Sequence, residues 1–142
     1  MDSSTIIFLA LAVAAWGMGA FFDKLTLRYI DPAGAFYVRT LFMVLLFVPF
    51  LAWKYVPTKQ ALLNSNKLVS VFVLSSVLTA MGGVFFFLKS MSGGEASKIV
   101  PLSSTYPFIT FLMAVIFLGE TFTASKFIGT ALISGGIYFI SK

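Results

Sequence analysis

The side chains that could do chemistry in this chain are few, and the most informative is a single arginine, Arg39, inside an apolar run. The sequence has no histidine and no cysteine, which removes imidazole bases, thiolates and the commonest metal ligands. No Asp or Glu lies in the middle of an apolar run, so the carboxylate of a proton-driven pump is not evident. We therefore expect neither an enzyme nor a bound cofactor or metal.

Arg39 lies about two turns inside its predicted helix, where a charge costs ~2.5 to 3.5 kcal/mol on insertion scales. Its head group could reach back toward Asp31 at the start of that helix, or it could line a cavity. We favour the cavity, because charges within a membrane are usually functional. A lining arginine would attract anionic or zwitterionic solutes.

A polar stripe accompanies Pro107 in a later apolar run. Ser103, Tyr106, Pro107 and Thr110 follow i, i+3, i+4, i+7 spacing, which places them on one helix face. Pro107 removes a backbone hydrogen bond and displaces the carbonyl of Ser103, so we expect a kink or break there. Broken backbone at membrane depth usually lines a cavity or is covered by protein.

Two other runs carry polar or small residues on one face. Interhelical packing is the more economical account of their Ser, Thr and Gly positions, whereas Trp16, far from either interfacial belt, favours a solute-lining role. The faces comprise Ser75, Thr79, Gly82 and Gly83 in one run and Trp16, Gly19, Ala20 and Asp23 in the other. The predicted solute contacts are Arg39, Trp16, Thr79, Ser103 and Tyr106.

The elements that must position these residues are five apolar stretches, each close to the ~20 residues that a bilayer core requires. They cover residues 6–22, 33–53, 68–88, 99–118 and 127–140, the last beginning within residues 123–126. Hydrophobic residues make up 59% of the 142 residues and charged residues 11%. The mean hydropathy of +0.99 excludes a soluble globule, and unbroken apolar runs exclude a barrel. We predict an all-α integral membrane bundle of five transmembrane helices, one domain over residues 1–142, with residues 54–67 as a solvated hairpin.

The net charge of +5 lies at the ends of the runs, where it meets lipid headgroups rather than nucleic acid. Five spans put the termini on opposite faces, and the lysines and arginines divide almost evenly between them. The face of the amino terminus has Lys54, Lys59, Lys67 and Lys126. The other face has Lys24, Arg28, Lys89, Lys98 and Lys142. Three explanations are open: one loop is wrongly assigned, a difference of a single charge suffices to orient the chain, or the protein inserts in both orientations.

The last run carries a small-residue groove. Gly129 and Gly136 are seven residues apart and lie within ~20° of one line on a helix, which permits close helix contact in lipid. We predict a dimer interface at Gly129, Leu132, Ile133 and Gly136; packing against another helix of the same chain is an equal alternative.

Several of these pieces occur together in a familiar order: Trp16-Gly17, Asp31-Pro32, Arg39, residues 95–102 followed by Pro107, and residues 118–120 followed by 129–136. In order and spacing they resemble the EamA-type domain of the drug/metabolite transporter superfamily, over essentially the whole chain. The resemblance implies an exporter or facilitator of small metabolites in a bacterial or archaeal cytoplasmic membrane. The related four-helix multidrug transporters depend on a glutamate in helix one, which is absent here.

Many members have ten spans made of two such five-helix halves, so the resemblance implies that two copies of this chain build one pathway. Halves with five spans each lie upside down relative to each other, which an antiparallel homodimer would reproduce. We expect alternating access for a small polar organic solute, with Pro107 at the gating bend. The alternative is a non-transporting accessory subunit that packs against a larger membrane partner.

Overall fold

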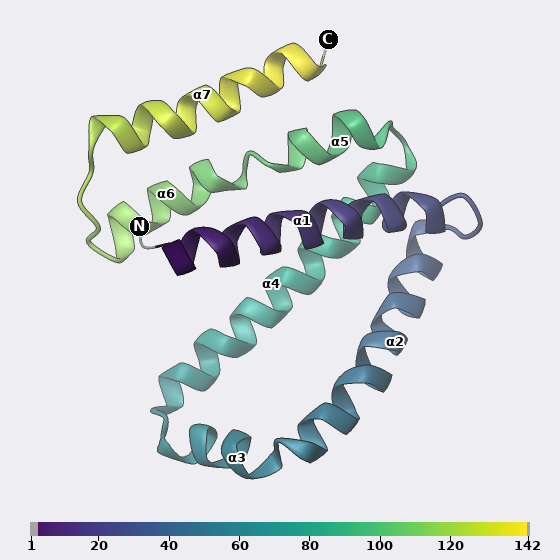
Figure 1. Ribbon diagram of the computed structural model, residues 1–142, viewed down its shortest axis with the longest axis vertical. Helices are drawn as coiled ribbons and strands as arrows, with labels where there is room; N and C mark the ends of the chain where they lie inside the picture. Colours follow the sequence, from purple (N-terminus) through teal and green to yellow (C-terminus); the bar gives the residue numbers. More distant parts are fainter. Residues whose placement is uncertain (1–2, 142) are drawn as a thin grey trace. The chain divides into compact units, whose positions relative to one another are not determined.

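The computed structural model describes residues 3–141, apart from the side chains of Tyr138 and Ser141. Within that range the chain is all-α (Figure 1). The helices are α1 (Ser3–Thr26), α2 (Pro32–Trp53), α3 (Tyr55–Asn64), α4 (Lys67–Ser92), α5 (Ala96–Ser103), α6 (Tyr106–Phe117) and α7 (Ala124–Ser141). The all-α prediction is confirmed.

The helices have the length and composition of membrane spans. Four segments of the described chain qualify, namely α1, α2, α4 and the stretch Ala96–Phe117 that α5 and α6 share. At 18 residues α7 is near the lower limit for a span, and it begins where the sequence predicted. Large apolar side chains are exposed along most of these helices, and α1 has no buried residue. Lipid supplies an apolar environment for them, and helices satisfy their own backbone groups there.

Two compact units make up the chain: Met1–Phe21 with Gly93–Lys142, and Phe22–Ser92. In the second unit α2 packs against α4, and α3 connects the carboxyl end of α2 to the amino end of α4 (Figure 1). Ala35, Leu88 and Met91 are buried where the start of α2 meets the end of α4. The rings of Phe36 and Phe85 pack edge to face there, with centroids 5.5 Å apart. This end of the α2–α4 pair therefore holds the small core of the unit.

Asp31 and Pro32 begin α2 as the sequence predicted. The Asp31 carboxylate accepts hydrogen bonds from the backbone amides of Ala33 (3.0 Å) and Gly34 (3.2 Å). Pro32 is the first residue of the helix, where its missing N–H leaves no intrahelical bond unmade.

The prediction of a solvated hairpin over residues 54–67 is wrong in its local structure. Residues Tyr55–Asn64 form a helix of ten residues, α3. Gln60, Ala61, Leu62 and Leu63 are residues with adequate to high helix propensity, and a helix also pairs backbone groups close to lipid. The segment is a helical connection instead of an open loop.

In the first unit α7 packs against α5 and α6. Phe111 of α6, Phe122 of the connection and Phe127 of α7 form a cluster with ring centroids 5.8 to 6.4 Å apart. Gly119 has φ of +66°, which glycine adopts without strain, and the chain reverses there. The turn and the cluster together fix the return of α7 alongside α6.

Candidate functional site

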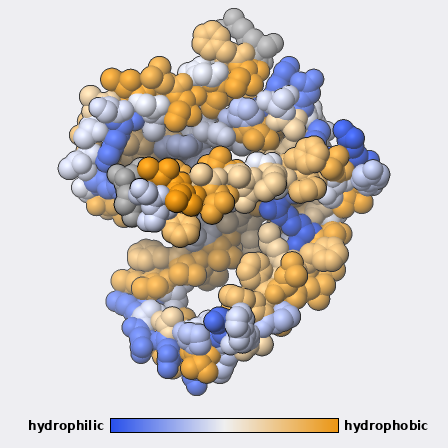
Figure 2. Space-filling view, viewed as in Figure 1, coloured by the Kyte–Doolittle hydropathy of each residue, from blue (hydrophilic) through white to orange (hydrophobic). Residues whose placement is uncertain are grey.

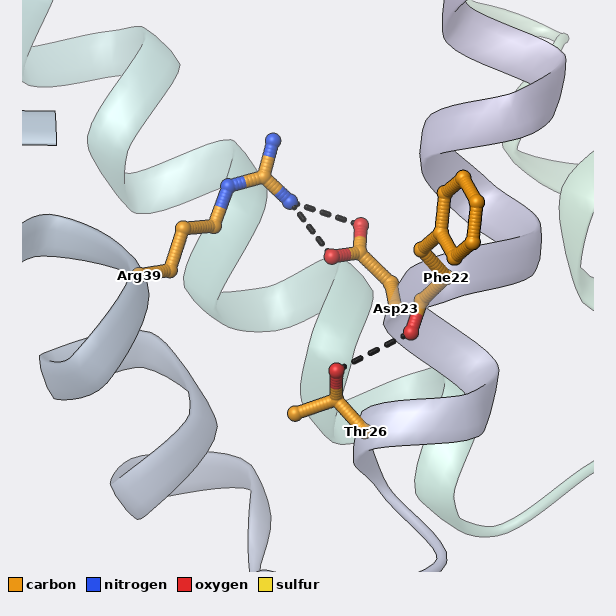
Figure 3. A network of polar contacts seen from close by, with 4 residues as sticks. All are labelled: Phe22, Asp23, Thr26 and Arg39. Atoms are coloured by element: carbon orange, nitrogen blue, oxygen red, sulfur yellow. Dashed lines mark hydrogen bonds and ion pairs between the residues drawn. The ribbon is translucent and has the colours of Figure 1, made fainter. Parts of the chain in front are cut away.

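An ion pair joins α1 to α2 in the unit Phe22–Ser92. Nη1 of Arg39 donates to both carboxylate oxygens of Asp23, at 2.7 Å to Oδ1 and 2.6 Å to Oδ2 (Figure 3). The side chains are 34% and 18% exposed for Arg39 and Asp23 respectively. Arg39 lies seven residues into α2, about 10 Å along the axis at 1.5 Å per residue. Asp23 therefore supplies the negative charge that an arginine at this depth in a membrane helix requires.

The guanidinium keeps donors beyond this pair. It has five N–H donors in a fixed plane, and only Nη1 bonds to Asp23. Within the described chain Nε and Nη2 make no hydrogen bond, and Figure 3 shows Nη2 directed away from Asp23. An oxygen of a solute can therefore bind Arg39 without first breaking the ion pair.

The last turn of α1 also contacts α4. Nζ of Lys24 donates to the carbonyl of Met91 at 2.7 Å, near the negative end of the α4 dipole. The Thr26 hydroxyl donates to the carbonyl of Phe22 at 3.0 Å (Figure 3). Asp23 and Lys24 thus attach this turn to α2 and α4, which holds the carboxylate in position for Arg39.

The break expected at Pro107 is present. α5 ends at Ser103 and α6 begins at Tyr106, so Pro107 stands in the first turn of a new helix. The amide of Ser104 donates to the carbonyl of Pro101 (2.9 Å) and that of Phe108 to Thr105 (3.0 Å), both three residues back. Because Pro107 has no N–H, the carbonyl of Ser103 lacks its usual helical donor. The predicted polar stripe therefore belongs to two helices and not to one continuous face.

Hydroxyls close to the break bond to their own backbone. Ser103 donates to the carbonyl of Val100 at 2.7 Å, and Thr110 donates to that of Tyr106 at 3.2 Å. In α4 the Thr79 hydroxyl donates to the carbonyl of Ser75 at 2.8 Å. These hydroxyls can still accept a hydrogen bond, so their local bonds leave a role toward a solute open.

The predicted solute contacts fall in both units. Arg39 and Thr79 belong to Phe22–Ser92, whereas Trp16, Ser103 and Tyr106 belong to the other unit. Trp16 and Tyr106 are exposed, and the polar partner of Arg39 is Asp23. A shared chamber for these five residues stays a prediction.

Three of the four predicted dimer residues, Leu132, Ile133 and Gly136, line an open apolar groove in the first unit. The groove has a volume of about 420 Å³ and is lined by Val100, Pro101 and Ser104 together with Leu132, Ile133, Gly136, Ile137 and Ile140. Leu132 and Ile133 are exposed, and a Cβ added at Gly129 or Gly136 would meet nothing within 4 Å. A neighbouring helix can therefore approach these glycines closely.

Asp23 is the residue that sequence reasoning undervalued. The first span was predicted to end at residue 22, which placed Asp23 in a connection, but α1 continues to Thr26. Asp23 does share a helix face with Trp16, and that pattern indicated a face directed toward the other helices. An acid on that face is a natural counterion for an arginine within the membrane.

Length, hydropathy and helix content define an integral membrane protein with several helical spans. Among the described residues, no group of three acidic, histidine or cysteine side chains could hold a metal ion.

Residues 3–142 match the EamA-like transporter family, and the chain belongs to it. It is 33% identical over 141 residues to an uncharacterized protein of Methanocaldococcus jannaschii, covering 99% of this chain and 98% of that one. It is 30% identical over 142 residues to an uncharacterized transporter of Archaeoglobus fulgidus, covering 96% of this chain but 47% of that protein. No solved structure matches the chain.

Proposed function

We propose that the protein carries a small polar organic solute across the cytoplasmic membrane, as an exporter or facilitator that works by alternating access. The observation that carries the proposal is the Arg39–Asp23 pair between two helices of membrane-spanning length. Charged groups are costly at such positions and usually serve a transport pathway. Membership of a transporter family supports the same conclusion.

Arg39 is the proposed primary solute contact. Its Nε and Nη2 offer the planar donor geometry that oxyanions bind, and the neighbouring Asp23 offers an acceptor for an ammonium or hydroxyl group. Trp16, Thr79, Ser103 and Tyr106 complete the proposed lining, with the two aromatic rings as flat amphipathic walls. The break before Pro107 is the proposed point of flexure, because few hydrogen bonds there resist bending.

Solute binding can be tested by thermal stabilisation of the purified full chain across a panel of small polar metabolites. A ligand that binds only the folded state raises the melting temperature by mass action. We expect Arg39→Gln to abolish the stabilisation by the best solute and Arg39→Lys to retain part of it. Arg28→Gln is the matched control, since Arg28 lies in the connection between α1 and α2. A solute that stabilises the wild-type chain and Arg39→Gln equally would remove Arg39 from the site.

We also propose that the working transporter is a homodimer with antiparallel protomers. The chain covers 47% of the transporter from Archaeoglobus fulgidus, so two copies have about the length of that one protein. Two copies of a chain with five spans take the arrangement of two fused halves only when they insert in opposite orientations. The nearly equal loop charges permit this.

The α7 residues Gly129, Leu132, Ile133 and Gly136 are the proposed contact between protomers. Gly129 and Gly136 are open to a neighbour, and close approach of backbones is how helices associate in lipid. In an antiparallel contact centred between Leu132 and Ile133, Gly129 of one protomer faces Gly136 of its partner. In a parallel contact each glycine faces its own copy.

Cysteine cross-linking separates these arrangements, because the natural chain has no cysteine. Gly129→Cys and Gly136→Cys each place a side chain in open space within the protomer. After an oxidant is added to the membranes, the antiparallel dimer predicts a disulfide when the two variants are co-expressed and none when either is expressed alone. Disulfides in each single variant would indicate a parallel dimer, and none in any combination would exclude this face of α7.

A further inference from the structure

The connection between α2 and α4 has a charge pattern that the proposed transport site does not use. α2 and α4 pack together as candidate spans, and α3 joins their ends, so α3 lies at one surface of the membrane. Lys54, Lys59 and Lys67 all fall in or beside this short helix. The sequence has no acidic residue between Asp31 and Glu95, and Asp31 lies at the opposite end of the α2–α4 pair.

These lysines differ from the paired cations elsewhere in the chain. Arg39 pairs with Asp23, and Lys126 lies 3.7 Å from Glu120. Among residues 3–141 the three lysines of the α3 end form no ion pair. The connection therefore presents a positive charge that its own unit does not neutralise.

Aromatic side chains stand beside two of the lysines. Nζ of Lys54 lies 4.2 Å from the ring centroid of Trp53, and Nζ of Lys59 lies 6.0 Å from that of Tyr55. Trp53 and Tyr55 are 75% and 61% exposed. Indole and phenol rings prefer the headgroup level of a bilayer, and a lysine can keep its stem in apolar surroundings while its ammonium reaches phosphate.

Exposed apolar side chains complete this surface. Val56, Leu62 and Leu63 of α3 are all exposed, as expected for a helix in contact with the acyl boundary. Figure 2 shows hydrophilic residues gathered over α3 and the start of α4, next to hydrophobic ones. We call the set Trp53, Lys54, Tyr55, Val56, Lys59, Leu62, Leu63 and Lys67 the α3 surface.

We infer that the α3 surface binds the headgroups of anionic phospholipids. The lysines supply the charge, the two rings hold the helix at headgroup depth, and the apolar residues face the upper acyl chains. Each lysine close to an anionic membrane surface adds about fivefold to association, so three add about a hundredfold. The inference is independent of the transported solute, since none of these residues belongs to the proposed transport site.

The test uses Trp53 as a reporter of the lipid next to it. The chain has two tryptophans, and Trp16→Phe leaves Trp53 alone. The full-length variant is reconstituted in phosphatidylcholine vesicles with equal mole fractions of phosphatidylglycerol, and one of the two lipids is brominated in turn. We expect brominated phosphatidylglycerol to quench Trp53 more strongly than brominated phosphatidylcholine. Replacing Lys54, Lys59 and Lys67 by glutamine should remove this difference, so that the two brominated lipids quench Trp53 equally.

The matched control replaces Arg28, Lys89 and Lys98 by glutamine, which lowers the net charge by the same amount at positions outside the α3 surface. We expect this variant to retain the preference for phosphatidylglycerol at Trp53. Equal quenching by the two lipids in the parent, or an equal loss in the control, would overturn the inference. Native mass spectrometry of the wild-type chain and the lysine variant, counting phosphatidylglycerol and phosphatidylcholine adducts, repeats the comparison without altering Trp16.

Discussion

The Arg39–Asp23 pair makes the sharpest energetic prediction, because both partners can be neutralised without a large change in volume. The perturbations are Asp23→Asn, Arg39→Gln and the double variant. Each single substitution leaves one charge without its partner, whereas the double variant leaves none. The coupling free energy of this double-mutant cycle isolates the interaction between the two side chains.

The size of the coupling can be estimated from the geometry. At 2.6 Å the Coulomb attraction is about 6 kcal/mol for an effective dielectric constant of 20 and about 1.6 kcal/mol for water. With 34% and 18% exposure the pair lies between these limits, and desolvation opposes the attraction. We expect a net coupling of about 2 kcal/mol. The double variant should therefore lose about 2 kcal/mol less unfolding free energy than the sum of the losses in the two single variants.

The same chain provides a control pair. Lys126 and Glu120 are 3.7 Å apart and 48% and 55% exposed, so a cycle of Glu120→Gln and Lys126→Gln should give a coupling below about 0.5 kcal/mol. The measurement is reversible unfolding of the full chain in mixed micelles, followed by far-ultraviolet circular dichroism. If the coupling of Arg39 with Asp23 were no larger than that of the control pair, Asp23 would not be the group that stabilises the charge of Arg39 within the membrane.

Two further predictions concern helix ends. Pro107→Ala supplies an N–H donor for the carbonyl of Ser103, so α5 and α6 should join into one helix. Amide hydrogen exchange of residues 103–108 should then slow, and the free energy of unfolding should rise by about 1 kcal/mol. Unchanged exchange would contradict this. Asp31→Ala should lower the unfolding free energy by about 1 kcal/mol through loss of the α2 cap. Gly34→Ala should lower the unfolding free energy by a similar amount, since the new Cβ would lie 2.8 Å from Oδ1 of Asp31 and disturb the same cap. The losses from Asp31→Ala and Gly34→Ala should therefore not add in the double variant, and additive losses in thermal melts would show that the cap tolerates the methyl group.

The spans and several of their ends were predictable because they depend on local properties. Apolar runs of about 20 residues identify helices in lipid whatever their neighbours are. Asp31-Pro32 identifies the start of α2, and Pro107 identifies the break between α5 and α6, since both act on the adjacent backbone. The helical form of the connection α3 was missed because its polar composition suits a loop as well as a surface helix.

What the sequence by itself determined is the class of the protein. The transfer of each apolar residue into lipid contributes independently of the fold, so hydropathy alone specifies an all-α membrane protein, and the order of its motifs indicates the family. The charge on Arg39 was likewise visible as a group that needs compensation.

Only the tertiary structure decided which group neutralises the charge on Arg39. Asp23 and Arg39 are separated by 16 residues and lie on different helices, and their contact depends on how the end of α1 is held against α2 and α4. No periodicity within one helix encodes the approach of two helices. The pairing is a property of packing, because an ion pair forms only where the fold brings the two head groups within hydrogen-bond distance.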